Sequence, residues 1–440
     1  MITIQVNAIR FSAGAAIGSS HTPPVDRRWH WRNLLLAPHR LGFFLALSVL
    51  ATASAWWALV QWSRLGLLAG LAYTVPPTLV HASVMVLGFF PLFFSGFLFT
   101  AGPRWLDVAP PKAPQLLAPL LLQALGWLAW LAGAHVHAGV ALGGLALAAL
   151  GLCWVTVLFW RLLRRSRVPD RVHARLIALA CTVGCASLLG LLASLLLDAP
   201  EVARAWVFTA LWGCVLAVFV SVAHRMIPFF TSSAMPMVQL WRPFWLLWLM
   251  AGMLALEAAS PWLELLLGDS LAAHAWLLLL GSLELLVGAV LLWLAGVWGL
   301  VQSLKNRLLA MLHLGFAWLG LALLLAGASR LLTQWLHSAV LPLGALHATT
   351  MGCLASLMLA MVTRVSCGHS GRALVADNRV WALFWALQAA TLARIAASFP
   401  SSLTQWLLAA AALLWLAVMA VWGARLGSWY GRARADGKPG

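Results

Sequence analysis

Apolar runs of about twenty residues recur along the whole chain, and they constrain its fold more than any other feature. A run of that length, wound as an α-helix, spans roughly 30 Å of hydrocarbon. Lipid offers the backbone no hydrogen-bond partners, so such a segment must be helical. The composition of the 440 residues, 63% hydrophobic and 9% charged, agrees with this interpretation. The sequence therefore predicts an all-α polytopic membrane protein.

Arg, Pro and Gly residues bound these runs and divide them into twelve expected transmembrane helices. We expect the helices near residues 41–60, 76–101, 115–133, 138–160, 176–197, 205–227, 240–257, 273–299, 308–328, 339–363, 379–398 and 402–424. The chain then divides into a basic N-terminal tail at 1–40, a membrane domain at 41–425 and a C-terminal tail at 426–440. The N-terminal tail has no apolar core of signal-peptide length, so we expect it to be retained.

The formal net charge of +17 is distributed unevenly among the loops. Most of the 28 Lys and Arg residues fall in loops on the side of the N-terminus, and four fall on the other side: Arg64, Arg204, Arg330 and Arg394. This asymmetry follows the positive-inside rule and predicts a bacterial inner-membrane protein with both termini in the cytoplasm. It accounts for the positive charge with the lipid bilayer as partner and without nucleic acid.

The six cysteines lie within the expected spans or at their cytoplasmic ends and include no CxxC pair, so a disulfide framework is not expected. Cys181 and Cys185 share a helical face. They could bind copper, but we favour small buried thiols in a packed helix.

Two of the expected spans carry the same short pattern, a histidine followed four residues later by a methionine. His81 and Met85 lie in the second span, and His347 and Met351 lie in the tenth. In each pair the two residues share a helical face. A histidine within hydrocarbon is costly unless it is bound or paired. A single one is best explained by a hydrogen bond to a neighbouring helix, whereas a matched pair favours a cofactor.

Both spans run inward from the outer face, so the helical rise places His81 about 9 Å and His347 about 12 Å below the outer boundary. Two neutral imidazoles at one level can ligate both faces of a haem iron, whose macrocycle would fill the apolar gap between the helices. We therefore expect a b-type haem with His81 and His347 as its metal ligands. Met85 and Met351 complete this cofactor site, either as sulfur ligands for Cu(I) or as packing, which we favour.

A fainter repeat relates the sixth and tenth spans. Gly213-Cys214 and Gly352-Cys353 are each followed, twelve residues after the Gly, by an arginine. Because the second, sixth and tenth spans are four apart, the pattern indicates three four-helix units.

Three segments carry longer motifs. They are HASVMVLGFFPLFFSGFLFTAGPRW from His81 to Trp105, HRMIPFFT from His224 to Thr231, and LHATTMGCLASLMLAMVTRVSCGHSGR from Leu346 to Arg372. Their order and spacing, together with the helix count, resemble the NnrS family of membrane proteins, which contain haem and copper and are linked to nitric oxide metabolism. The family pattern has Gly at the position of His224.

The resemblance implies a haem-bearing inner-membrane protein of denitrification or nitrogen-oxide stress, with nitric oxide or an electron donor as partner. It also implies copper as a second cofactor. The family motif that begins at His81 is similar to His-x-His-Glu-Met, whereas this chain has Ser83 and Val84 at the second His and the Glu. That departure puts a copper site at this position in doubt.

The cytoplasmic ends of the same spans hold a second cluster of polar residues. Its members are Arg104, His224, Arg225, Arg364, His369 and Arg372. The positive-inside rule alone explains any single arginine there. The Gly368-His369-Ser370-Gly371 turn and the break at Pro228 indicate irregular backbone around a polar cavity. Such a pocket could hold an anion, a haem propionate or a second metal.

Glu284 stands near the middle of the eighth span, where an ionised carboxylate without a partner is disfavoured by several kcal/mol. We expect it to be protonated or paired. It would relay protons to a buried redox centre, or it would form a hydrogen bond to a neighbouring helix, and the sequence does not separate the two.

The leading hypothesis is thus a haem protein of the NnrS type, and its link to nitric oxide follows from the resemblance alone. The residues leave open whether the haem carries electrons, senses redox state or binds nitric oxide, and whether the protein is an enzyme. The alternative is a polytopic transporter of a small anionic substrate that uses the Arg and His pocket and has no redox cofactor. A third hypothesis is an assembly subunit.

Overall fold

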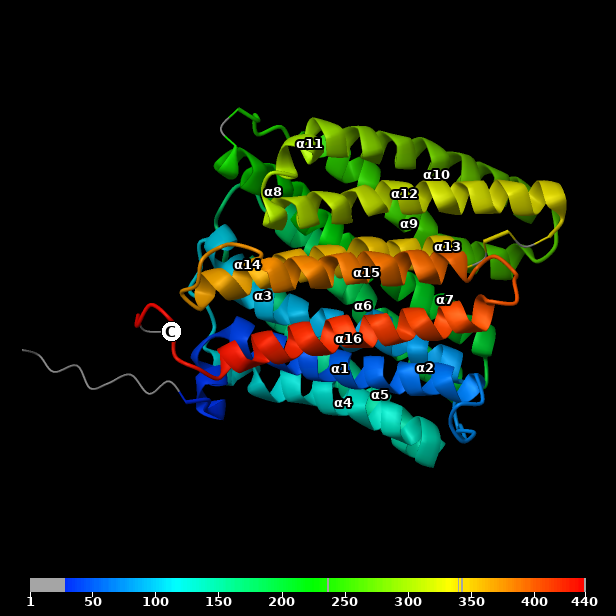
Figure 1. Ribbon diagram of the computed structural model, residues 1–440, viewed down its shortest axis with the longest axis horizontal. Coiled ribbons are helices and arrows are strands. Elements are labelled where there is room, and N and C mark those ends of the chain that lie inside the picture. The colour runs from blue at the N-terminus through cyan, green and yellow to red at the C-terminus, as the bar shows by residue number, and fades with distance from the viewer. Residues whose placement is uncertain (1–27, 236, 339, 342, 439–440) are drawn as a thin grey trace, which may run out of the picture.

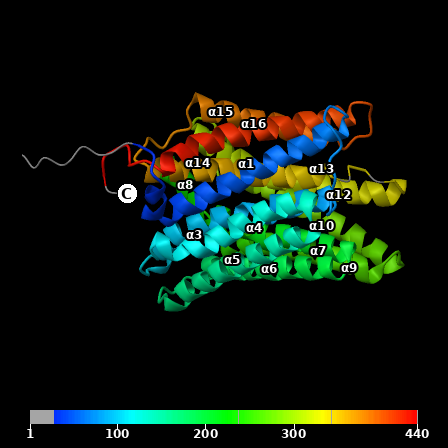
Figure 2. The same cartoon turned by 90° about the horizontal axis from the view of Figure 1, so that it is seen from below.

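The computed structural model describes residues 28–438 apart from 236, 339 and 342. The described residues form helices and no strand, and the long helices run side by side as one bundle (Figures 1 and 2). The predicted all-α polytopic fold is confirmed. Most of the expected N-terminal tail lies outside the described residues.

Within the described part of the chain, twelve long helices traverse the bundle, and three of them consist of two α-helices joined by a π-helical stretch. In order they are α1 (Pro38–Arg64), α2–α3 (Pro77–Leu106), α4 (Leu117–Val136), α5 (Ala138–Arg165), α6 (Val172–Leu196), α7–α8 (Pro200–Ala234), α9 (Phe244–Leu267), α10 (Leu271–Val297), α12 (Arg307–Leu336), α13–α14 (Gly344–His369), α15 (Asn378–Ala396) and α16 (Thr404–Tyr430). The short elements are 3₁₀ turns at Trp31–Leu36 and Ala113–Leu116, and α11 (Leu300–Ser303).

Eleven of these helices are long and apolar enough to cross a membrane. The twelfth, α15, has 19 residues and includes Arg379, Gln388 and Arg394, which lower its mean hydropathy. The buried Gln388 amide accepts a hydrogen bond from Trp318 Nε1 at 2.7 Å and donates one to Ser356 Oγ at 3.0 Å. Its polar atoms are therefore satisfied inside the bundle, and α15 occupies the place of the span predicted at 379–398.

The two ends of the described chain meet at one end of the bundle. His30 N and Asn33 Nδ2 each donate to Gly431 O at 2.8 Å. Arg40 Nη1 donates to the carbonyls of Tyr430 and Arg432 at 3.1 and 2.9 Å. A chain that returns to its starting end makes an even number of passes, which requires that α15 also traverse the bundle. We call this end, where α1 begins and α16 ends, the basic end, and the opposite end the far end.

The twelve helices follow one another around the bundle, and we describe them as three consecutive sets of four, the units that the sequence pattern predicts. Within each unit the second helix packs against its neighbours in the chain, and α2–α3, α7–α8 and α13–α14 are here called the inner helices. Adjoining units are joined by the contacts of α5 with α6, α10 with α12, and α16 with α1. The last contact closes the ring.

Each inner helix is interrupted at a matching place by a π-helical stretch. The stretches are Val84–Gly88 between α2 (Pro77–Ser83) and α3 (Phe90–Leu106), Ala210–Leu216 between α7 (Pro200–Thr209) and α8 (Ala217–Ala234), and Ala348–Ala355 between α13 (Gly344–His347) and α14 (Ser356–His369). Gly88, Gly213 and Gly352 fall within them, so the glycine repeat extends to the first unit. π-helical turns are rare and occur frequently at functional sites.

The backbones of α4 and α5 approach each other closely within their hairpin, and glycine substitutions can test this packing. A Cβ atom on Gly126 would lie 2.5 Å from Gly144 O, whereas one on Gly143 would meet nothing within 4 Å. We expect Gly126→Ala to lower stability by about 1–3 kcal/mol, because the two backbones would have to separate. Gly143→Ala is the matched control and should be neutral or slightly stabilising. Melting temperatures in one detergent would check this, and equal values for the two variants would contradict the packing.

The start of α15 depends on a carboxylate outside the membrane-spanning segments. Asp377 accepts hydrogen bonds from Arg425 Nη1 and Nη2 at 2.9 and 2.6 Å and from Val380 N at 3.0 Å. The bonds from Arg425 hold the pKa of Asp377 below its usual value.

A depressed pKa means that Asp377 stabilises the folded state above its unfolded pKa of about 3.9, and that this contribution is lost as the pH falls through the lower, folded value. We expect Asp377→Asn to cost about 0.5–1 kcal/mol at pH 7. Unfolding titrations from pH 7 to pH 3 should show the variant and the wild type converging in acid. If the difference in unfolding free energy between the two proteins stayed constant with pH, the ion pair could not be its cause.

Candidate functional site

His81 and His347 lie toward the far end of the bundle, each just before the π-helical stretch of its inner helix. His81 is on α2, three residues before that stretch, and His347 is the last residue of α13. Both side chains are half-buried. They are close enough to interact electrostatically with each other, and both are within the same range of Arg394. The structure thus brings together two residues that are far apart in the sequence.

The hydrogen bond of His347 fixes which of its ring nitrogens is available. Nδ1 lies 2.8 Å from the carbonyl oxygen of Leu343, and because a carbonyl only accepts, Nδ1 carries the proton and donates. Nε2 then has a free lone pair. Histidines that ligate metals are oriented in this way, by a carbonyl or carboxylate on the other nitrogen.

The imidazole of His81 is held by stacking. Its ring centroid lies 3.7 Å from that of Trp57 on α1, with 15° between the planes, and the Arg64 guanidinium lies 5.4 Å from the same indole centroid. His81 Nδ1 is buried and has no hydrogen-bond partner. A buried polar atom without a partner costs about 1–3 kcal/mol, a penalty that a ligand would remove. The two histidines therefore offer a donor set that suits a haem iron.

The methionines of the shared pattern lie within the π-helical stretches. Met351 is 9% exposed and belongs to the hydrophobic core, and Met85 is partly buried against the same core. This position suits the packing role that we favour.

The register of the three inner helices shows that His81 and His347 are not equivalent positions. His81 is seven residues before Gly88, whereas His347 is five residues before Gly352. In the second inner helix the corresponding residues, counted from Gly213, are Trp206 and Phe208. The His-x-x-x-Met pattern is therefore independent of the helical repeat, and the chemistry of the site differs among the units.

The cysteines find partners on neighbouring helices. The Cys185 thiol on α6 donates to Thr156 Oγ1 on α5 at 3.3 Å and is near Cys153 on the same helix α5. Cys181 is near Cys214 in the second π-helical stretch. Among residues 28–438, with their three gaps, no group of three or more His, Cys, Asp or Glu side chains could hold a metal ion.

The polar cluster expected at the basic end is divided among several sets of partners. Three of its guanidinium groups lie over aromatic rings. They are Arg225 over Trp105 at 5.1 Å, Arg364 over Phe230 at 4.0 Å and Arg372 over Trp429 at 4.3 Å. The first two contacts join α8 to α3 and α14 to α8, and Arg104 on α3 is near His369 on α14. These cation–π contacts thus connect the three inner helices at this end.

The two histidines of the cluster each pair with a histidine that the sequence did not single out. His224 is fully buried, with Nδ1 at 3.0 Å from His173 Nε2 and Nε2 at 3.2 Å from Pro243 O. The ring of His369 lies 4.4 Å from that of His39. His39 and His173 were not predicted from the sequence because both lie in basic segments, whose polar residues the positive-inside rule already explained. The six residues therefore engage different partners.

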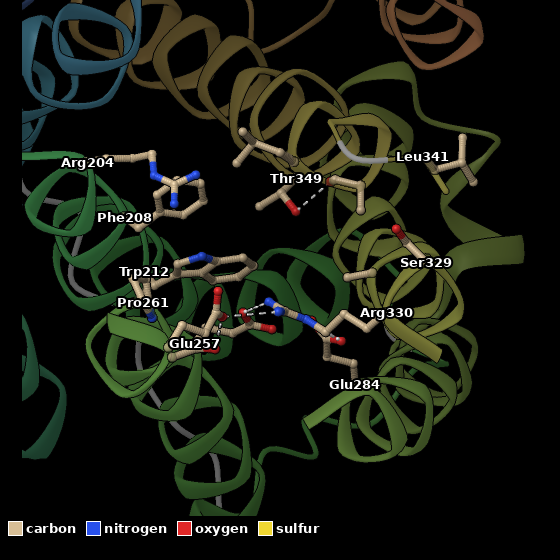
Figure 3. Close-up of a pocket in the computed structure, with 15 residues that line it drawn as sticks. Arg204, Phe208, Trp212, Glu257, Pro261, Glu284, Ser329, Arg330, Leu341 and Thr349 are labelled. Carbon is tan, nitrogen blue, oxygen red and sulfur yellow. Dashed lines mark hydrogen bonds and ion pairs between the residues drawn. The ribbon is translucent and has the colours of Figure 1, made fainter. Parts of the chain in front are cut away.

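Glu284 is paired with an arginine. Being protonated or paired were the two states that we expected for it. Arg330 Nε donates to both of its carboxylate oxygens at 3.1 Å, and Arg330 Nη2 lies 3.2 Å from Glu257 Oε2. The two carboxyl groups are also close enough to share a hydrogen bond. They line a cavity of about 230 Å³ between α7, α9, α10, α12 and α13 (Figure 3). The sequence signal for Arg330 was its place among the four arginines outside the basic loops.

The cavity adjoins the helix that carries His347. Ala345, Leu346 and Thr349, on either side of that residue in the chain, line its wall. The carboxyl pair and the histidine are therefore separated by one helix.

Comparison with known proteins agrees with this architecture. A family model described as NnrS protein matches residues 33–434, which include all twelve long helices and both histidines. No curated protein sequence matches the chain. Since the matched region is most of the chain, the protein belongs to the NnrS family, whose members are linked to nitric oxide.

Proposed function

We propose that the protein holds a b-type haem between α2 and α13, with His81 and His347 as axial ligands, and that it acts in the bacterial response to nitric oxide or related nitrogen oxides. The observation that carries the proposal is the pair of neighbouring imidazoles. One has a free Nε2 fixed by a backbone carbonyl, and the other has a buried Nδ1 without a partner. A haem held there by both imidazoles would supply one-electron chemistry.

The surrounding residues would orient the ligands and balance charge. The Leu343 carbonyl holds the His347 ring, and the Trp57 indole covers one face of His81. Arg394 and Arg64 place positive charge near His81, which suits the propionate groups of a haem. The apolar residues of the inner helices would exclude water.

The charge distribution supports a bacterial inner-membrane location with the basic end in the cytoplasm. Both chain termini would then be cytoplasmic, and the haem would lie toward the outer face. An electron donor or nitric oxide would reach it from that side or from the lipid.

Glu284 is proposed to hold a proton together with Glu257. The pair faces a cavity that also borders the helix of His347, so it could exchange protons between that cavity and the redox site. Arg330 would keep one negative charge of the pair in place while the proton is held.

Copper stays a prediction of the family resemblance. Metal analysis of the purified protein would decide this separately from the haem.

Transport of an anion is less well supported than haem binding. The arginines of the basic end engage aromatic rings, and the cavity at the far end is lined by three glutamates, Glu257, Glu264 and Glu284. Carboxylates repel anions, so this cavity does not suit an anionic substrate.

Haem binding is tested by reduced-minus-oxidised optical spectra of the detergent-purified protein. We expect a b-type spectrum in the wild type and its loss in both His81→Ala and His347→Ala, since each variant removes one axial ligand. His274→Ala removes an exposed histidine of the far end and is the matched control. A colourless but folded wild-type protein, or a spectrum unchanged in either ligand variant, would overturn the proposal.

The proton role of Glu284 is tested by redox titration of the bound haem between pH 6 and pH 8. If reduction is coupled to proton uptake, the midpoint potential should fall with rising pH by up to about 59 mV per unit. Glu284→Gln should flatten this slope, whereas Asp269→Asn, which removes an exposed carboxylate outside the cavity, should leave it unchanged. Identical slopes in all three proteins would show that the carboxyl pair does not exchange protons with the haem.

A further inference from the structure

We propose that the far-end cavity beside Arg330 is a binding site for a small alkylammonium cation. The site lies between the second and third units and shares Glu257 and Glu284 with the proposed proton pair. Its wall is formed by carboxylates from α9 and α10, the guanidinium of Arg330 on α12 and aromatic rings from the second inner helix (Figure 3).

The cavity is large enough and accessible enough to admit a ligand. Its volume of about 230 Å³ is many times the roughly 10–15 Å³ that a single water molecule requires. Two of its lining residues, Glu264 and Arg204, have side chains that are 42% and 67% exposed. A solute could therefore enter between them from the far end.

The charge of the cavity is negative. Three carboxylates, those of Glu257, Glu264 and Glu284, converge on one guanidinium, that of Arg330. Arg204 also lines the cavity, but it is paired with Glu201 at 3.1 Å. The excess of carboxylates over guanidinium groups favours a cation.

One carboxylate oxygen is left for that cation. Glu257 is 2% exposed, and its Oε1 has no hydrogen-bond partner. Both oxygens of Glu284 accept from Arg330, and Glu264 Oε1 accepts from Ser260 Oγ at 2.7 Å. An N–H donor in the cavity would satisfy Glu257 Oε1 in place of the proton proposed for the carboxyl pair.

The aromatic wall distinguishes an alkylammonium group from a metal ion. Trp212 and Phe208 line the cavity, and Figure 3 shows the Trp212 indole beside the Glu257 carboxylate. Aromatic faces attract organic cations and tolerate their methylene groups. A bare divalent ion would face the positive Arg330, and the described residues provide no group of three metal ligands.

The same ammonium chemistry occurs in free amines and in the headgroup of phosphatidylethanolamine. Ethanolamine is the probe shared by both, and ethylene glycol is its neutral counterpart of similar size. Calorimetric titration of the full-length protein in detergent should show saturable binding of ethanolamine and none of ethylene glycol. Equal binding of the two, or no binding of ethanolamine by folded protein, would overturn the proposal.

Variants locate the site. Glu257→Gln removes the charge with little change of shape and should weaken ethanolamine binding at least tenfold. Trp212→Leu should weaken it by a smaller factor, about threefold to tenfold, because it removes one aromatic face. Asp269→Asn removes an exposed carboxylate of the same end that does not line the cavity; it is the matched control and should bind as the wild type does. Melting temperatures without ligand would show that the variants are folded, and unchanged affinity in a folded Glu257→Gln protein would place any binding elsewhere.

Native mass spectrometry separates the two sources of the cation. Retention of phosphatidylethanolamine over phosphatidylglycerol by the wild type, lost in Glu257→Gln, would identify a lipid headgroup. Binding of free ethanolamine without such selectivity would identify a soluble amine.

Discussion

Lipid leaves every backbone N–H and C=O group to find its partner within the protein, and the architecture follows from that requirement. Nine of the twelve long helices meet it as continuous α-helices, although Pro261 within α9 has no N–H to donate. The other three contain π-helical stretches, in which the bonding pattern shifts and the backbone widens. Protein neighbours cover these stretches, whose residues are mostly buried. The two candidate histidines and the cavity both adjoin them, so the proposed sites coincide with the irregular backbone.

Divergence among the three units explains why one scaffold holds different chemistry at each junction. The inner helices share a glycine and a π-helical stretch, but the residues five and seven positions before the glycine differ. The first and third units each contribute one histidine there, and the second contributes the bulky Trp206 and Phe208. The proposed haem site therefore lies where the first and third units meet. Phe208 of the second unit lines the cavity that adjoins the third unit.

Length, hydropathy and loop charge were sufficient to predict the twelve helices, because each depends on residues close together in the chain. The proximity of His81 and His347 also followed from topology. The partner of Glu284 did not, since Arg330 lies 46 residues away on another helix and only packing brings them together. For the same reason the sequence grouped six polar residues of the basic end that the structure gives to separate partners, such as Arg225 to Trp105 and His224 to His173.

The hydrogen bonds that join the two chain ends have a consequence for biogenesis. α1 leaves the ribosome first, yet the helix that packs along it, α16, leaves last. Until then the side of α1 that packs against α16 lacks this neighbour, and Arg40 lacks the carbonyls of Tyr430 and Arg432 that later bind it. The order of synthesis and the order of assembly thus differ, and the final insertion event closes the structure. A circular permutant that began with α16 would place these partners side by side from the start.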